Sequence, residues 1–349
     1  MAVVATGFFD GVHLGHRRVV EALVSSARQR GEEAVAVTFS RHPRAVLQQD
    51  ARDLRLLNSP QEKEALLLSL GVDRVETLTF DRAFARMTAE QYIRDVLRDR
   101  LGATALVLGY DNRIGSDRLT PDRITPIAEA LGLTVVIVSP ATAAPLRSSQ
   151  PRQTSGCAGP HRFACSTPQI QDLRGPRNSL AVPPLTSRGW LRPGEAAAAS
   201  TAPAVAEVTI SSTKIREALA EGNVEDAEAM LGYPYWLRGV VVGGKQLGRT
   251  IGFPTANLRL YDPMKLIPAR GVYLTEVEVL GSHHWGMTNV GDILETHIFD
   301  FDEDIYGLDL EIRFRRWLRA MRSFDSLDAL KIQLAADEAA CRRCLSFTK

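Results

Sequence analysis

Two histidines stand near the start of the chain in the run Gly7-Phe8-Phe9-Asp10-Gly11-Val12-His13-Leu14-Gly15-His16. The run follows a short β-branched segment and precedes an amphipathic one, which predicts a turn from a strand into a helix. A helix N-terminus offers free N–H groups and a positive dipole end, and glycines there let a phosphate approach closely. His13 and His16 could then stabilise the charge that develops on a leaving pyrophosphate. The alternative is a glycine turn with two surface histidines. It would be favoured for a single histidine, but not for two histidines spaced as H-x-G-H where a strand passes into a helix.

A second candidate phosphate site is the run Ile210-Ser211-Ser212-Thr213-Lys214-Ile215-Arg216, which precedes a strong helical pattern over residues 213–230. Hydroxyls at Ser211, Ser212 and Thr213 suit a helix cap, and with Arg216 they offer donors for phosphate oxygens. By itself such a run is only a cap. Together with the histidine pair, it predicts a second phosphate-binding element of the same site.

The third string is Gly248-Arg249-Thr250-Ile251-Gly252-Phe253-Pro254-Thr255-Ala256-Asn257. A glycine and proline turn entering a strand would explain Gly252 and Pro254 but not the whole string. Just before it, Gly239 to Gln246 has the spacing of a P-loop, but Gln246 stands where a hydroxyl residue must reach Mg²⁺. We therefore assign that stretch no nucleotide-binding role of the P-loop type.

The first half of the chain alternates short β-branched runs with amphipathic segments. Strands are expected at residues 3–5, 34–39, 74–78, 105–108 and 133–138, and helices at 17–29, 60–70, 88–101 and 121–131. This alternation predicts βαβ units, a parallel sheet and a ligand at the carboxyl ends of its strands. We expect a Rossmann-like α/β domain.

The last third has a different pattern, with short period-2 runs between glycines and prolines. Strands are expected at residues 237–242, 271–280, 285–290, 295–299 and 308–313, followed by a helix at 326–343. Such a series predicts a small antiparallel β-barrel with a terminal helix.

Residues 145–207 resemble neither half. Between Pro145 and Pro203 lie 9 of the 18 prolines and 7 arginines, with Asp172 and Glu195 as the acidic residues. Without an apolar period such a segment cannot offset its ordering entropy, so we expect a disordered insert. An alternative hypothesis is out-of-frame or misassembled sequence, which resequencing of the gene would test. The expected domains are residues 1–144, with 208–232 as their continuation, and 233–349.

Composition narrows the function classes. The 349 residues carry 42 basic and 41 acidic side chains, and this near-zero net charge gives no reason to expect nucleic acid or a membrane as partner. The N-terminus lacks a basic leader, so we expect a cytoplasmic protein. We also expect a monomer or weak homo-oligomer. Cys341 and Cys344 form a C-x-x-C, for which free thiols in a reducing compartment are favoured over a metal or redox site.

The H-x-G-H run resembles the HIGH-type nucleotidyltransferases and, more narrowly, the adenylyltransferase module of bacterial riboflavin kinase/FAD synthetases. The resemblance continues through Val37 to Pro43, though Arg41 replaces the family's proline, and through Leu108 to Gly115. It implies adenylyl transfer from ATP to FMN. The residues that it places in the site include His13, His16 and Arg216 as catalytic groups. As nucleotide-binding residues it implies Gly7, Phe8, Asp10, Gly11, Gly15, Asp111, Ser211, Ser212 and Thr213, and as flavin-binding residues Phe39, His42 and Pro43.

The G-F-P-T-A-N string is similar to the riboflavin kinase signature, which implies phosphorylation of riboflavin by ATP. In that family the threonine and asparagine bind Mg²⁺, here Thr255 and Asn257, and their oxygen donors suit this cation. The resemblance adds Gly248, Thr250 and Gly252 to the nucleotide site. It makes Glu295, in Leu294-Glu295-Thr296-His297, the general base for the ribityl hydroxyl.

The chain departs from the family after Gly291, where Asp292-Ile293 leads almost directly to the strand of Glu295 and a loop of several residues is missing. The main reading is a bifunctional enzyme that uses riboflavin, FMN, ATP and Mg²⁺. The alternatives are a monofunctional FMN adenylyltransferase with a disabled kinase half and a flavin- or nucleotide-binding regulatory module without turnover.

Overall fold

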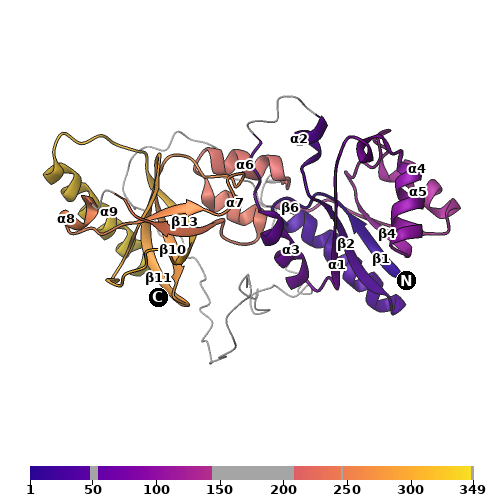
Figure 1. Ribbon diagram of the computed structural model, residues 1–349, viewed down its shortest axis with the longest axis horizontal. Coiled ribbons are helices and arrows are strands. Elements are labelled where there is room, and N and C mark those ends of the chain that lie inside the picture. Colours follow the sequence, from indigo (N-terminus) through magenta and orange to yellow (C-terminus); the bar gives the residue numbers. More distant parts are fainter. Residues whose placement is uncertain (48–53, 144–207, 245–246, 347–349) are drawn as a thin grey trace, which may run out of the picture. The chain divides into compact units, whose positions relative to one another are not determined.

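The computed structural model describes residues 1–47, 54–143, 208–244 and 247–346 (Figure 1). These residues form two compact units, and the chain passes from the first to the second between Ser212 and Thr213. The predicted insert at 145–207, with Cys157 and Cys165, lies outside the described residues. Our domain boundaries stay predictions. In the parts of the chain that the structure describes, no helix is long and apolar enough to cross a membrane.

The first unit is built on a five-stranded sheet with the order β3-β2-β1-β4-β5, in which every neighbouring pair is parallel. The strands are β1 (Ala2–Thr6), β2 (Glu33–Phe39), β3 (Arg74–Leu78), β4 (Ala103–Gly109) and β5 (Thr134–Val138). Continuous burial along β1 fits a parallel sheet that is covered on both faces. The strand order reverses between β1 and β4, and such a switch point is where open α/β sheets bind ligands. The predicted Rossmann-like fold is confirmed.

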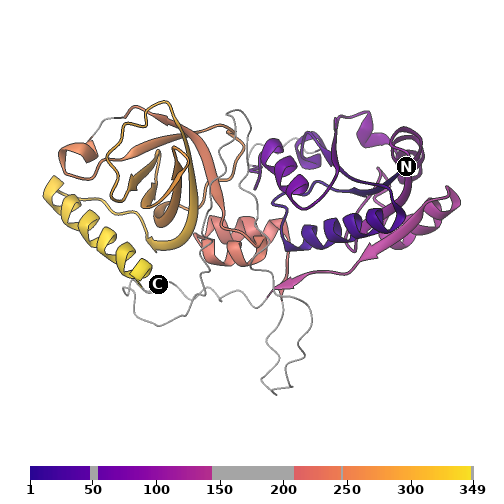
Figure 2. The ribbon, with the colours of Figure 1, turned by 90° about the horizontal axis from the view of Figure 1, so that it is seen from below.

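Helices cover both faces of this sheet. One face packs under α1, which contacts β1, β2 and β4 and runs along the sheet in Figure 2. The other face holds the core in which Ile93, Leu97 and Ile124 pack on strand residues such as Val4 and Leu106. The helices of this unit are α1 (Leu14–Arg30), α2 (Pro43–Leu47), α3 (Pro60–Ser69), η1 (Phe84–Arg86), α4 (Ala89–Gln91), η2 (Tyr92–Arg100) and α5 (Pro121–Ala130).

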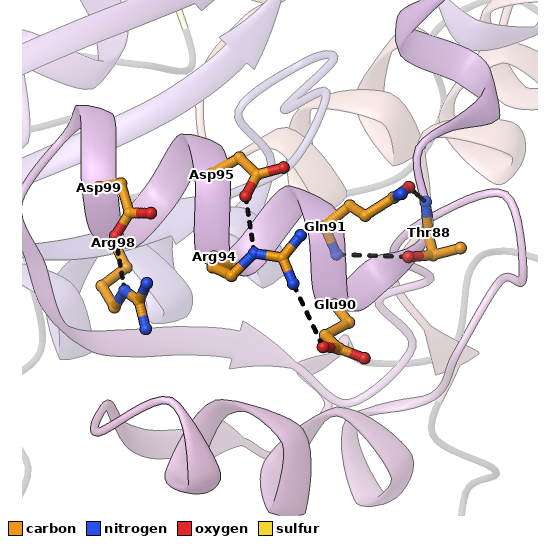
Figure 3. A network of polar contacts seen from close by, with 7 residues as sticks. All are labelled: Thr88, Glu90, Gln91, Arg94, Asp95, Arg98 and Asp99. Atoms are coloured by element: carbon orange, nitrogen blue, oxygen red, sulfur yellow. Dashed lines mark hydrogen bonds and ion pairs between the residues drawn. The ribbon is translucent and has the colours of Figure 1, made fainter.

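The helix expected at residues 88–101 is present, and it consists of a single α-turn followed by a π-helix. Thr88 and Gln91 cap its start reciprocally, with Thr88 N donating to Gln91 Oε1 at 2.9 Å (Figure 3). Tyr92 and Leu97 are both buried, and their spacing of five matches the wider π-turn. The ion pairs drawn in Figure 3, such as Arg94 with Asp95, lie on the exposed side of the helix and contribute little stability.

A two-stranded antiparallel pair and two helices lead to the second half of the chain. β6 (Thr142–Ala143) pairs antiparallel with β7 (Val208–Thr209), and α6 (Ser212–Ala220) and α7 (Val224–Leu231) follow. A single helix was expected at 213–230, and Gly222 interrupts it with a left-handed φ of 78°. A Cβ on Gly222 would lie 2.5 Å from the ring of Trp317, so the break also makes room for that ring.

The second unit contains a closed six-stranded barrel with the order β10-β11-β12-β9-β8-β13, and all of its pairs are antiparallel. Its elements are β8 (Trp236–Val242), α8 (Leu247–Thr250), β9 (Ala256–Leu260), β10 (Gly271–Val279), β11 (Ser282–Val290), β12 (Leu294–Ile298), β13 (Asp309–Arg319) and α9 (Leu327–Ser346). The predicted barrel with a terminal helix is confirmed. The sequence pattern did not predict β9.

The terminal helix α9 packs on the outer face of the barrel. Cys341 is buried with Leu274 and Met287 in the core beneath the helix. The carboxylate of Asp337 pairs with Arg319 at 2.7 Å, and both side chains are nearly buried. Cys344, three residues further along α9, is half-buried. This ion pair and apolar patch together fix α9 to the barrel.

Three fully buried threonines form a row of hydroxyl groups across neighbouring strands of the barrel. The hydroxyl oxygens of Thr275 and Thr288 lie 2.9 Å apart, and those of Thr288 and Thr296 also lie 2.9 Å apart. The Thr275 hydroxyl donates to the carbonyl of Gly286 at 3.3 Å. We call these residues the threonine row.

Candidate functional sites

The loop between β1 and α1 has a backbone that few sequences could adopt. Phe9, Gly11 and Val12 all have left-handed φ angles, of 52°, 83° and 34°. A Cβ on Gly15 would lie 3.1 Å from the His13 ring, so glycine leaves room for that ring against the first helical turn. The loop is therefore shaped around the start of α1, where phosphate binding was predicted.

The two histidines of this loop stack on each other. Their ring centroids lie 3.7 Å apart at an interplanar angle of 14°, and His13, the N-cap of α1, accepts a hydrogen bond from His16 N. Burial, followed by the neighbouring His13 and Lys63, holds the pKa of His16 well below its ordinary value. His16 Nδ1 is buried and has no hydrogen-bond partner among the described residues. A neutral imidazole with an unsatisfied ring nitrogen thus lies at a helix N-terminus.

Asp10 plays a structural part in this loop. Its buried carboxylate accepts hydrogen bonds from Leu57 N at 3.0 Å and Asn58 N at 3.2 Å. Its carbonyl accepts a hydrogen bond from the hydroxyl of Ser212 at 2.8 Å. That bond brings Ser212, the start of α6, next to the histidine loop, as expected of two halves of one site. The carboxylate therefore fixes the backbone at Leu57 and Asn58.

The remaining predicted residues of the nucleotide site differ in their setting. Ser211 is half-buried beside Ser212, whereas Thr213 and Arg216 belong to the second unit, so their alignment with the histidines stays a prediction. Asp111 is exposed in the loop after β4. Its neighbour Asn112, which sequence reasoning did not single out, donates to the carbonyl of Thr6 at 2.8 Å and holds this loop against the end of β1.

Aromatic rings gather beside the loop, where the flavin residues were predicted. The ring of Phe8 meets His42 edge-on at 4.5 Å. Phe39, at the end of β2, makes edge contacts with Phe80 and Phe84. Pro43 begins α2, and its side chain lies outside the described residues. The rings of Phe8 and His42 thus come together, while Phe39 belongs to a neighbouring aromatic cluster.

In the barrel, three neighbouring strands place three polar residues side by side. Glu295 on β12 is the register partner of Asn257 on β9 and of Asn289 on β11. Asn289 Nδ2 donates to Glu295 Oε2 at 3.3 Å. The amide oxygens of Asn257 and Asn289 are buried without hydrogen-bond partners in the described ranges. One carboxylate is therefore flanked by two unsatisfied oxygen acceptors.

Glycines allow the chain to pack tightly around this row. A Cβ on Gly244 would lie 1.7 Å from Asn257 Nδ2, and one on Gly248 would lie 2.2 Å from the carbonyl of Phe253. Gly252 adopts a left-handed φ of 85°, and Thr250 ends α8 exposed to solvent. The glycine-rich stretch, to which we assigned no P-loop role, therefore packs closely against the candidate metal ligand Asn257 through Gly244.

A cavity of about 310 Å³ opens beside Thr255. It is bordered by β8, β9, β12 and the loop after β12, and its lining residues are Val241, Arg249, Pro254, Thr255, Ala256, Thr296, Ile298, Phe301, Asp302, Glu303, Asp304, Ile305 and Tyr306. Sequence reasoning did not assign Arg249 or Tyr306 to a site. These residues line the cavity because segments distant in the sequence come together there, and a local sequence pattern cannot predict such contacts.

Comparison with known proteins identifies the families of both parts of the chain. The FAD synthetase family matches residues 1–151, and the riboflavin kinase family matches residues 231–345. A bifunctional riboflavin kinase/FMN adenylyltransferase of Escherichia coli strain K12 is 32% identical, over 99% of this chain and 94% of that protein. The chain belongs to this bifunctional family.

Other relatives cover similar lengths. The bifunctional riboflavin kinase/FMN adenylyltransferase of Listeria monocytogenes is 29% identical over 96% of this chain and 90% of that protein. A crystal structure described as a macrolide-efflux protein from Streptococcus pneumoniae has a TM-score of 0.74 and 30% identity, and covers 98% of this chain and 93% of that chain. The family assigns both activities to the protein, phosphorylation of riboflavin and adenylylation of FMN, and both use ATP.

The residues at Asn257 fit the magnesium ion that the family implies. The unsatisfied Oδ1 of Asn257 is a hard oxygen donor, and the hydroxyl of Thr255 lies two residues before it on the wall of the cavity. Mg²⁺ prefers such oxygen ligands and keeps further positions for phosphates and water. The ion itself stays a proposal.

After Gly291, where the resemblance implies a longer loop, the chain forms a tight hairpin. Gly291 N donates to the carbonyl of Ile293 at 3.3 Å, and Val290 pairs directly with Leu294. Glu295 nevertheless keeps its register with Asn257 and Asn289. The missing loop therefore leaves the row around the predicted base in place.

Proposed function

We propose that His13 and His16 bind the triphosphate of ATP in the adenylyltransferase site. The stacked imidazoles lie at the N-terminus of α1, and the unsatisfied Nδ1 of His16 provides a hydrogen-bonding atom for a phosphate group. Ser212 is bonded to the same loop and would supply a second set of contacts together with Ser211, Thr213 and Arg216.

In this reaction a phosphate oxygen of FMN forms a bond to the α-phosphorus of ATP while the bond from that phosphorus to pyrophosphate breaks. The protein's part is to align the two phosphates and to stabilise the charge on the leaving group. The loops holding Gly7, Gly11 and Gly15 would accommodate the triphosphate, and Asp111 would lie near the nucleotide or flavin. Phe39, His42 and Pro43 are the proposed flavin contacts.

In the kinase site, Glu295 would accept the proton of the ribityl 5′-hydroxyl as that oxygen attacks the γ-phosphorus of ATP. The observation that supports this assignment is the row of Asn257, Glu295 and Asn289, which places a carboxylate between a candidate metal ligand and an amide. Mg²⁺ held by Thr255 and Asn257 would neutralise phosphate charge. Gly248, Thr250, Gly252 and the adjoining cavity would hold the nucleotide.

The competing assignment is a monofunctional FMN adenylyltransferase whose kinase half is inactive without the loop after Gly291. The intact register of Glu295 favours an active kinase. Incubation of the full chain with riboflavin, ATP and Mg²⁺ should therefore give FMN and then FAD. FAD formed only from added FMN would select the monofunctional enzyme, and no turnover of either flavin would select a binding module.

We also place both reactions in the cytoplasm. The two reactions share ATP as a substrate, which supports this location. Fractionation of cells that produce the tagged protein would test this location, and recovery outside the cytoplasmic fraction would contradict it.

A further inference from the structure

Lys63 is a buried cation beside the adenylyltransferase loop that the proposed reaction does not use. It lies in the middle of α3 and is only 4% exposed. Its ammonium donates to the carbonyl of Phe8 at 3.1 Å and to the carbonyl of Phe39 at 3.4 Å, and it lies 4.1 Å from the centroid of the Phe8 ring. One side chain therefore joins the loop after β1, the end of β2 and an aromatic ring of the site.

A lysine in this setting is costly, because burial of an ammonium loses its hydration. Burial lowers the pKa of Lys63 to about 8, and the nearby Asp10 carboxylate acts in the opposite direction. Packing alone would be served better by an apolar side chain of the same length.

The groups around Lys63 are those of the candidate site. Asp10 faces it from the loop after β1, and His16 from α1 is close enough for the ammonium to help lower the pKa of that imidazole. From the segment after β2, His42 contacts the Phe8 ring that the ammonium overlies. Lys63 thus acts on the predicted triphosphate and flavin contacts at once.

We propose that Lys63 is a positioning residue for FMN adenylylation, whose ammonium fixes the Phe8 loop to the end of β2 before ATP binds. This inference rests on the proposed adenylyltransferase site. It makes the charged form of Lys63 the active one, because the ammonium makes charge-assisted hydrogen bonds to both carbonyls and a cation–π contact with the Phe8 ring, all of which weaken when the amine is neutral.

Activity and stability then respond to pH in opposite directions. The folded-state pKa of Lys63, about 8, lies below its ordinary value of 10.5. The buried charge therefore lowers the free energy of unfolding below pH 8, and this loss of stability is relieved as the pH rises from about 8 towards 10.5. FAD synthesis should instead fall as the ammonium loses its proton. A merely structural lysine would not give an alkaline loss of activity without a loss of stability.

The test compares full-length wild type with Lys63→Met and Lys63→Arg between about pH 6 and about pH 10. FAD formation from FMN and ATP is measured together with FMN formation from riboflavin and ATP, which reports on the other unit. Lys63→Met should lower kcat/KM for adenylylation on the order of tenfold and abolish the alkaline limb, with FMN formation unchanged. Lys63→Arg, which stays charged, should retain more activity and move the limb beyond the measured range.

Wild-type rates and the same alkaline limb in Lys63→Met would overturn the proposal. If Lys63→Met does not fold, Lys63→Arg provides the test. An alkaline limb of FAD formation that stays near pH 8 in this variant would exclude Lys63 as its source. FAD formation by wild type near neutral pH tests the proposed function independently. A failure confined to the variants therefore concerns Lys63 alone.

Discussion

At the scale of single residues, Glu295 lies in register between two asparagines and is hydrogen-bonded to one of them. Its register partners are Asn257 and Asn289, and the amide of Asn289 donates to its carboxylate. This arrangement orients one carboxylate oxygen and leaves the other for a proton. This geometry supports the proposal that Glu295 is the general base.

We expect Glu295→Gln to lower the kcat of FMN formation about a hundredfold or more, because an amide cannot accept the proton of the attacking hydroxyl. FAD formation from added FMN should remain at the wild-type rate. Both rates can be measured by chromatography of the flavins. Unchanged FMN formation would exclude Glu295 as the base.

Two adjacent glycines provide a matched pair of substitutions near the candidate metal ligand. A Cβ on Gly244 would overlap Asn257, whereas one on Gly243 would meet no atom within 4 Å. Gly244→Ala should therefore displace Asn257 and lower kinase activity on the order of tenfold, with a weaker response to added Mg²⁺. Gly243→Ala should behave as wild type. Equal kinetics of the two variants would contradict the role of Asn257.

At the scale of elements, the interrupted helix at Gly222 depends on a distant ring. Gly222→Ala would pay for its left-handed backbone, about 1–2 kcal/mol, and for overlap with Trp317, a further ~1–3 kcal/mol. Gly281→Ala is the control, because Gly281 has a similar φ of 74° and open space around it. Urea unfolding followed by tryptophan fluorescence should show the larger loss of stability for Gly222→Ala. Equal losses would mean that the ring moves aside.

The sequence pattern predicted most elements of both units because burial and backbone period coincide in them. Residues 74–78, for example, are the bounds of β3 as predicted. The pattern did not predict those details of local structure that distant contacts decide. Gly222 interrupts a helical period in favour of Trp317, and the π-helix at Tyr92 to Arg100 follows the burial of Tyr92 and Leu97 against the sheet.

The same limit applies to the candidate sites. The types and spacing of His13 and His16 were sufficient to suggest phosphate chemistry, but their stacking depends on the cap geometry of α1. The hydrogen bonds of Asp10 reach Leu57, and the ammonium of Lys63 reaches Phe8, across long stretches of sequence. Such contacts appear only when the sheet brings the segments together.

At the scale of the whole molecule, His16 and Glu295 lie in units with separate cores. We therefore expect variants of the two sites to complement each other in solution. His16→Ala should make FMN but no FAD from riboflavin, and Glu295→Gln should make neither. An equimolar mixture should make FAD, after a lag during which free FMN accumulates. A mixture that makes no FAD would show that FMN does not pass between molecules.

The threonine row has a consequence for what the cavity can recognise. Each hydroxyl has one proton, and Thr275 gives its proton to the carbonyl of Gly286. Thr288 must then donate to Thr275, and Thr296 to Thr288, so the row has a fixed direction. Thr296 borders the cavity, and with its proton committed its oxygen can only accept. The barrel wall therefore offers a hydrogen-bond acceptor, and no donor, at Thr296. This favours a ligand that carries an N–H or O–H group at this point.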